Sequence, residues 1–174
     1  QYNYLDRRNE EAMAYAAQKG LGVVVMGPVG GGRLAMKPKG VTDLPGLGDY
    51  EPAELALRFV ISNPHVDVAL SGMGSVSMVE QNVSAVEKGP LEPSQIRALN
   101  ALMDRYHELA KLYCTGCEYC MPCPNGVNIP RCFELYTYLT VYGLEQYALE
   151  QYAQLVSEGK DAAQCTECET CLER

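Results

Sequence analysis

The spacing of the cysteines constrains this chain more than any other feature of its sequence. A first cysteine run lies in CTGCEYCMPCP and consists of Cys114, Cys117, Cys120 and Cys123, each three residues from the next and followed by Pro124. A second cysteine run repeats this spacing near the end of the chain with Cys165, Cys168 and Cys171. Seven of the eight cysteines thus fall in two short runs, which suits shared metal sites better than loop-closing disulfides. We therefore expect a reducing, cytoplasmic setting.

Cysteines at i, i+3 and i+6 let one short loop ligate three irons of a [4Fe–4S] cluster, while another segment supplies the fourth ligand. In the two-cluster ferredoxin pattern that fourth cysteine stands before a proline in the opposite run. Cys123 would then complete the cluster of the second run, and the cluster of Cys114, Cys117 and Cys120 would need a cysteine about one position beyond Arg174.

Other metal arrangements stay open. Two residues rather than three separate Cys120 from Cys123, so the first run could hold one cluster alone while the second run serves another. Zinc is the rival metal, although its sites usually combine two separated CxxC pairs. Cys132 lies outside both runs and is interpreted as a small buried residue at the start of a helix. We expect one or two [4Fe–4S] clusters.

Composition excludes several classes of protein. The net charge of −8 provides no basic surface for phosphate backbones, which argues against nucleic acid as a partner. No apolar run approaches the roughly 20 residues of a membrane span. The chain starts at Gln1 without the pattern of a signal peptide, and we interpret this start as a cut.

The first two thirds of the chain have the pattern of an α/β fold. Helices are predicted at residues 6–19, 52–63 and 93–112, and buried strands at 21–26 and 66–72. A glycine-rich loop at 27–34 and the turn after residue 72 follow these strands, where such folds bind ligands. The segment at 35–50 is predicted as a long surface loop or lid, and Ser77 with Glu80 as the capping box of a further helix. Residues 130–163 are helical in pattern, with breaks at Gly143 and Gly159.

The segments QYNYLDR, GVVVMGPVGGGRL, ELALRFVISNPHVDVALSGMGS and VEQNV, in this order, resemble the last third of an aldo/keto reductase barrel. Together with CTGCEYCMPCPNGVNIP they resemble the subfamily that carries a carboxyl-terminal 4Fe–4S ferredoxin-type domain. The resemblance implies an α/β fold in which the last part of a (β/α)8 TIM barrel, residues 1–112, precedes an all-α, ferredoxin-like two-cluster domain, residues 113–174. Three strands of such a barrel would expose hydrophobic edges, so we expect the isolated chain to associate or open.

The resemblance also implies a nicotinamide dinucleotide site. Gln1 would bind the nicotinamide carboxamide, and Met26 stands where many members stack a tyrosine on the nicotinamide ring. The pyrophosphate would follow Gly27, Pro28 and Val29, and the adenosine end would bind Gly72, Met73, Gly74, Gln81 and Asn82. Met78 replaces the arginine with which NADPH-preferring members grip the 2′-phosphate. The family's catalytic residues lie on the first four strands, so none is assigned in this chain.

The function implied is that of an iron–sulfur oxidoreductase. It would couple hydride transfer between NAD(P) and a small carbonyl or alcohol substrate to electron transfer through [4Fe–4S] clusters, with a redox protein as a further partner. The alternative is a non-catalytic ferredoxin-like electron carrier or adaptor with a degenerate barrel. A third interpretation is a structural cluster or zinc knot that only staples the carboxyl-terminal end.

Overall fold

The computed structural model describes residues 1–172, so the last two residues of the predicted cysteine domain lie outside the described part. The chain forms two compact units, Gln1–Met103 and Asp104–Arg174. The division falls inside helix α4, Pro93–Lys111. In the part of the chain that the structure describes, no helix is long and apolar enough to cross a membrane.

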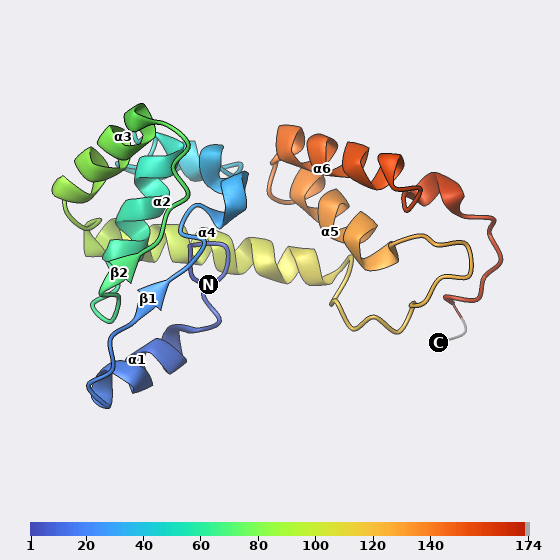
Figure 1. Ribbon diagram of the computed structural model, residues 1–174, viewed down its shortest axis with the longest axis horizontal. Helices are drawn as coiled ribbons and strands as arrows, with labels where there is room; N and C mark the ends of the chain where they lie inside the picture. Colours follow the sequence, from blue (N-terminus) through green and yellow to red (C-terminus); the bar gives the residue numbers. More distant parts are fainter. Residues whose placement is uncertain (173–174) are drawn as a thin grey trace. The chain divides into compact units, whose positions relative to one another are not determined.

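The first unit alternates helices and strands in the predicted order (Figure 1). Its elements are α1 (Glu10–Gln18), β1 (Val24–Val25), two 3-10 helices (Gly30–Ala35 and Val41–Asp43), α2 (Pro52–Ile61), β2 (Val68–Ala69), α3 (Val76–Glu87) and the first part of α4. The unit is an α-rich α/β fold.

The two strands pair in parallel, with Val24 opposite Val68 and Val25 opposite Ala69. Burial alternates along β1: Val25 is 2% exposed, whereas Val24 is 58% exposed. The prediction that both faces of this strand are buried is therefore wrong for this chain, because side chains on successive residues point to opposite faces and only one face is covered. Residues 1–172 contain two strands, β1 and β2, whereas three barrel strands were expected.

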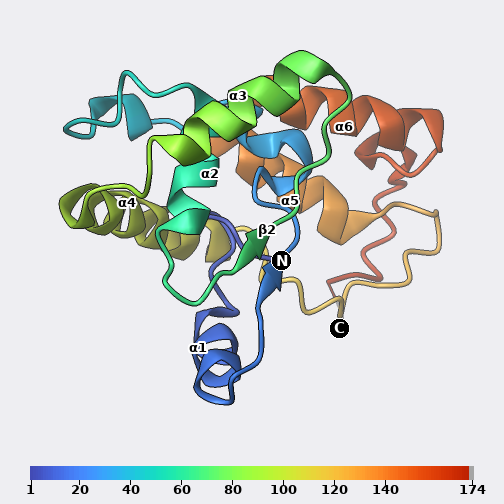
Figure 2. The same ribbon diagram turned by 60° about the vertical axis from the view of Figure 1, so that its left-hand side comes forward.

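Helix α2 carries the core of the first unit. Pro52 stands in its first turn, where the missing N–H costs nothing. Leu55 and Val60 are fully buried and Phe59 nearly so, and the Phe59 ring meets the Tyr4 ring edge-on at 5.9 Å. Helices α2 and α3 lie side by side in both views (Figures 1 and 2).

Arg58 ties α2 to the segment between α3 and α4. Its Nε donates to the Gly89 carbonyl at 2.8 Å and its Nη2 to the Pro90 carbonyl at 3.1 Å. The guanidinium carbon also lies 4.8 Å from the centre of the Tyr50 ring. One side chain thus holds three segments of the unit together.

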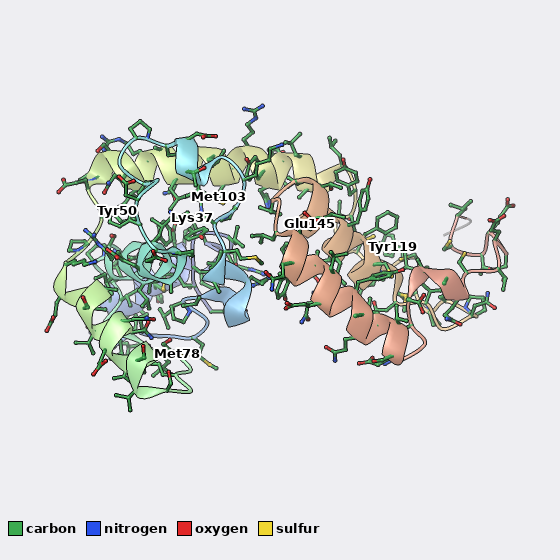
Figure 3. The ribbon with its side chains drawn as sticks, turned by 90° about the horizontal axis from the view of Figure 1, so that it is seen from above. Lys37, Tyr50, Met78, Met103, Tyr119 and Glu145 are labelled. Carbon is green, nitrogen blue, oxygen red and sulfur yellow. The ribbon has the colours of Figure 1, made fainter. Side chains whose placement is uncertain are left out.

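The segment at 35–50 is packed against its unit and does not have the character of a lid. Val41 and Leu47 are fully buried, which anchors the segment in the core. The Lys37 ammonium donates to the Gly48 carbonyl, and Gln95 on α4 donates to the Gly46 carbonyl at 2.7 Å. Figure 3 labels Lys37 and Tyr50, which both belong to this segment.

Helix α3 begins earlier than its predicted capping box. Its N-cap is Ser75, whose hydroxyl accepts from the Met78 N–H at 3.3 Å, and Ser77 lies inside the helix. The extended backbone of Ser75 places its oxygen over the first turn, so Ser75 takes the capping role that we assigned to Ser77.

The second unit contains a helical hairpin of α5 (Ile129–Thr140) and α6 (Glu145–Ser157), followed by a 3-10 helix at Ala162–Gln164. Asn128 caps α5 by accepting from the Arg131 N–H at 3.2 Å. Leu144, in the turn between the helices, is fully buried. Figure 1 shows the two cysteine runs in the loops that precede α5 and follow α6.

Candidate functional site

The amino terminus packs against the end of β1. The Tyr2 N–H donates to the Met26 carbonyl at 3.2 Å, and the Asn3 amide donates to the Gly27 carbonyl at 2.9 Å. A Cβ on Gly27 would lie 3.0 Å from Nε2 of Gln1, and Gly27 has a φ of +65°. Gln1, Met26 and Gly27, three of the predicted cofactor residues, therefore lie together, and glycine is required at the third position.

The residues that follow Gly27 differ in their access to solvent. Met26 is 65% exposed, so its side chain is available as an apolar platform. Pro28 is buried and Val29 is half-buried. The predicted contact of these residues with a pyrophosphate remains a prediction.

The end of β2 emerges beside the end of β1. The Leu70 N–H donates to the Val25 carbonyl at 2.8 Å, so the residues after both strands leave the sheet at the same edge. Asn82 donates to the Ser71 hydroxyl at 3.1 Å, which fixes this predicted site residue to the turn.

The remaining predicted residues of this turn are open to solvent. Gly72, Met73, Gly74 and Gln81 are all exposed. The Gly74 N–H donates to the sulfur of Met78 at 3.4 Å, so Met78 covers the start of α3. This is the position at which the resemblance implies an arginine in NADPH-preferring members. These residues form the solvent-exposed part of the sheet edge at which β1 and β2 end.

Sequence reasoning missed Asn3, which organises the amino-terminal segment. It is fully buried, and its Oδ1 accepts from the N–H groups of Leu5 and Asp6, both at 3.0 Å. With its donation to Gly27 it thereby connects the first turn of the chain to the glycine loop. The available signal was the habit of asparagine side chains to bond backbone N–H groups two and three residues ahead.

The first cysteine run forms a tight loop whose amides turn toward a sulfur. The Gly116 N–H lies 3.4 Å from Sγ of Cys114, and the Met121 N–H donates to the Glu118 carbonyl at 2.9 Å. Gly116 and Glu118 have φ values of +73° and +63°. A glutamate in this left-handed region is uncommon and costs about 1 kcal/mol or more.

The second cysteine run repeats this conformation position by position. The Glu167 N–H lies 3.4 Å from Sγ of Cys165, and the Leu172 N–H donates to the Glu169 carbonyl at 2.8 Å. Glu167 and Glu169 have φ values of +55° and +59°, so the left-handed positions also correspond between the two runs. Backbones with alternating left-handed residues form concave sets of N–H groups that bind anions, iron–sulfur clusters included.

Hydrogen bonds lower the pKa of the middle cysteine in each run. The Tyr119 N–H, followed by the Thr115 hydroxyl, lowers the pKa of the Cys117 thiol, and the Thr170 hydroxyl and N–H lower the pKa of the matching Cys168 thiol. Both middle cysteines are therefore deprotonated more easily than an ordinary cysteine thiol, and the thiolate is the form that binds metal.

Two further thiols have raised pKa values. Burial, together with the charges of Cys114, Cys117 and Cys171, raises the pKa of the Cys120 thiol. The contribution of Cys171 indicates that the two runs lie close to each other. Burial and the charge of Asp161 raise the pKa of Cys132.

Side-chain contacts also join the two runs. Asn125, two residues after Cys123, donates to the Thr166 hydroxyl at 2.9 Å and to Sγ of Cys168 at 3.6 Å. An apolar cavity of about 580 Å³ lies against α5 and α6, and its lining includes Cys132, Cys165 and Cys171. Within residues 1–172, however, no three His, Cys, Asp or Glu side chains are gathered closely enough to hold a metal ion.

The residues of the two runs fit a [4Fe–4S] group in chemistry and in backbone shape. Thiolate is the ligand that such clusters take, and the paired N–H···S contacts at Cys114 and Cys165 are of the kind that stabilise them. The seven cysteines lie in one compact unit.

Part of the chain is similar to a known protein family. Residues 46–104 match the sequence model of the aldo/keto reductase family. This stretch comprises α2, β2, α3 and the first part of α4. The match supports the predicted resemblance to aldo/keto reductases. It does not extend to the cysteine runs, so the subfamily with a 4Fe–4S domain stays a prediction.

Two individual proteins are similar to this chain. An uncharacterized oxidoreductase of Schizosaccharomyces pombe is 31% identical over 85 residues, which cover 48% of this chain and 28% of that protein. The solved holo form of an aldo-keto reductase from Bacillus halodurans is 31% identical, with a TM-score of 0.49, over 58% of this chain and 40% of that chain. This chain thus spans less than a third of the curated relative that it matches.

Proposed function

We propose that this chain is part of an iron–sulfur oxidoreductase of the aldo/keto reductase type. Its first unit would contribute to a nicotinamide dinucleotide site, and its second unit would hold one or two [4Fe–4S] clusters. The family match over residues 46–104 supports the first part. The second part rests on one observation, the repetition of the same loop, with the same left-handed positions and the same N–H···S contacts, at both cysteine runs.

In the first unit the edge where both strands end would receive the dinucleotide. Gln1 lies in contact with Gly27 and is exposed, so its amide is free of burial and can reach a carboxamide. Met26 would cover one face of the nicotinamide ring. Asn82 would hold the turn at Ser71 in place while the exposed backbone of the turn at 72–74 meets the adenosine end.

The same edge favours NADH over NADPH. Met78 lies at the start of α3, where its sulfur accepts from Gly74, and it brings no positive charge to a 2′-phosphate. Charge-assisted bonds from arginine are the usual means of gripping that group. The substrate would be a small carbonyl or alcohol, and proton transfer would come from residues outside this chain.

In the second unit the cysteines would ligate the clusters. Cys114, Cys117 and Cys120 would hold one, and Cys165, Cys168 and Cys171 with Cys123 the other. A nicotinamide supplies hydride and a [4Fe–4S] cluster supplies one-electron transfer, so the pair would connect a two-electron substrate to a one-electron redox protein. The need for reduced thiols favours a cytoplasmic setting.

The proposal is tested on the whole protein, reconstituted anaerobically with iron and sulfide. We expect about four iron and four sulfide per cluster, since a cube holds four of each, and an electron paramagnetic resonance signal that develops on addition of NADH. Stoichiometric zinc without iron would contradict the cluster. A cluster that dithionite reduces but NADH does not would favour the non-catalytic electron carrier.

A further inference from the structure

Cys168 receives a side-chain hydrogen bond from the segment that follows the other run. Nδ2 of Asn125 lies 3.6 Å from Sγ of Cys168 and 2.9 Å from Oγ1 of Thr166. A primary amide carries two N–H groups, so one can donate to each acceptor. Because the threonine oxygen holds one N–H, the amide is oriented with the other toward the sulfur.

A second donor reaches the same sulfur. Oγ1 of Thr170 lies 3.5 Å from Sγ of Cys168. A cysteine that ligates metal is a thiolate and can only accept, so in the loaded state the threonine hydroxyl donates. Cys168 would then accept from an amide and a hydroxyl in addition to backbone groups.

The first run differs at the matching position. Cys117 occupies the place of Cys168 in the repeated loop, and Tyr119 stands where the second run has Thr170. The Tyr119 ring is 72% exposed, and Figure 3 shows it in the loop between α4 and α5. The two cysteine loops thus share one backbone conformation, but the side chains around Cys117 differ from those around Cys168.

We propose that Asn125 is a positioning residue that donates to the Cys168 sulfur and raises the reduction potential of the cluster held by the second run. This inference rests on the proposed function, since it assumes that the run binds a cluster. Hydrogen bonds to ligand sulfurs stabilise the more negative, reduced state and therefore raise the potential.

The test is a redox titration of the full reconstituted chain, followed by electron paramagnetic resonance, in wild type and in Asn125→Leu. Leucine keeps the side-chain size and removes both donors without adding charge. We expect one midpoint potential to fall and any other to stay unchanged. The fall is about 59 mV if the ratio of reduced to oxidised cluster at a given potential drops tenfold. Gln146→Leu removes an exposed amide that bonds Glu150 on α6 and serves as the matched control, with unchanged potentials.

The outcomes separate this inference from the proposed function. If wild type binds no iron and sulfide, the proposed function fails, and this inference with it. If wild type loads fully but Asn125→Leu keeps its potentials, or lowers all of them equally, Asn125 has no specific role and only the inference fails. If Asn125→Leu loses a cluster, the smaller Asn125→Ala decides: it removes both donors without introducing a branched apolar side chain, and a potential unchanged from wild type overturns the inference.

Discussion

Replacing Arg58 by methionine should destabilise the first unit by about 3.5–4 kcal/mol. Methionine retains an apolar stem but loses two charged hydrogen bonds, to the carbonyls of Gly89 and Pro90 at 2.8 and 3.1 Å. Bonds from charged donors contribute roughly 1.5–3 kcal/mol each, and the second of these is exposed, so the lower end applies. The contact with the Tyr50 ring adds about 0.5–1 kcal/mol.

The ion pair of Arg58 with Glu54 adds little to this sum. Its 3.3 Å separation is long, and Glu54 keeps a second partner in Lys88 at 2.8 Å. Near the surface such pairs contribute about 0–1 kcal/mol. Arg58→Lys should therefore lose about half as much as Arg58→Met, because it keeps the charge near Tyr50 but cannot reach both carbonyls at once.

The measurement is urea unfolding followed by circular dichroism at the helix band. We expect a lower midpoint for Arg58→Met with an unchanged slope, and an intermediate midpoint for Arg58→Lys. A loss below about 1 kcal/mol for Arg58→Met would refute the reasoning, since that is less than one charged hydrogen bond contributes. Equal losses in both variants would show that the forked geometry is unimportant.

Three further changes test single features of the structure. Ser75→Ala should cost about 1 kcal/mol in the same unfolding assay, because the α3 cap is lost, and Ser75→Asn should restore most of it. In metal-free protein near neutral pH, iodoacetamide should modify Cys117 and Cys168 before Cys132, because a lowered pKa gives more thiolate; mass spectrometry that finds Cys132 first would contradict this. Burial raises the pKa of Tyr4 above its value in the unfolded chain. The stability that depends on a neutral Tyr4 is therefore fully present below about pH 10 and is lost as the pH rises above that value. Tyr4→Phe should thus change little at pH 7, since the buried hydroxyl has no partner among the described residues, and should weaken the alkaline loss of stability seen by urea unfolding.

Local signals predicted the helices well because their determinants lie within each segment. The predicted helix at 52–63 corresponds to Pro52–Ile61, whose start is set by proline and whose apolar face is set by spacing. The predicted helix at 93–112 corresponds to Pro93–Lys111. The α3 start was displaced because Ser75 and Ser77 are both able to cap, and the path of the preceding turn selects between them.

Strands were harder to predict because a strand is defined by its neighbours. The apolar runs at 21–26 and 66–72 fulfil the pattern of buried strands, yet only two residues of each pair. Val24 and Val68 are 58% and 46% exposed, since no further element covers that face in the described chain. Sequence pattern reports what a strand could bury, whereas pairing decides what it does bury.

The choice of fourth ligand shows what spacing leaves undecided. Cys123 is three residues from Cys120, so it could close the cluster of the first run as readily as that of the second. Asn125 favours the second run, because it touches Thr166 and Cys168, and two residues of chain span at most about 7 Å.

Cys123→Ser should therefore remove the cluster of the second run and leave that of the first. Iron analysis and electron paramagnetic resonance of the reconstituted chain would show the loss of one signal, the one that Asn125→Leu shifts. Cys117→Ser is the matched control and should remove the other signal, since Cys117 belongs only to the first run. If Cys123→Ser and Cys117→Ser abolish the same signal, Cys123 closes the first run, and the contact of Asn125 with Cys168 joins two independent sites without marking a shared one.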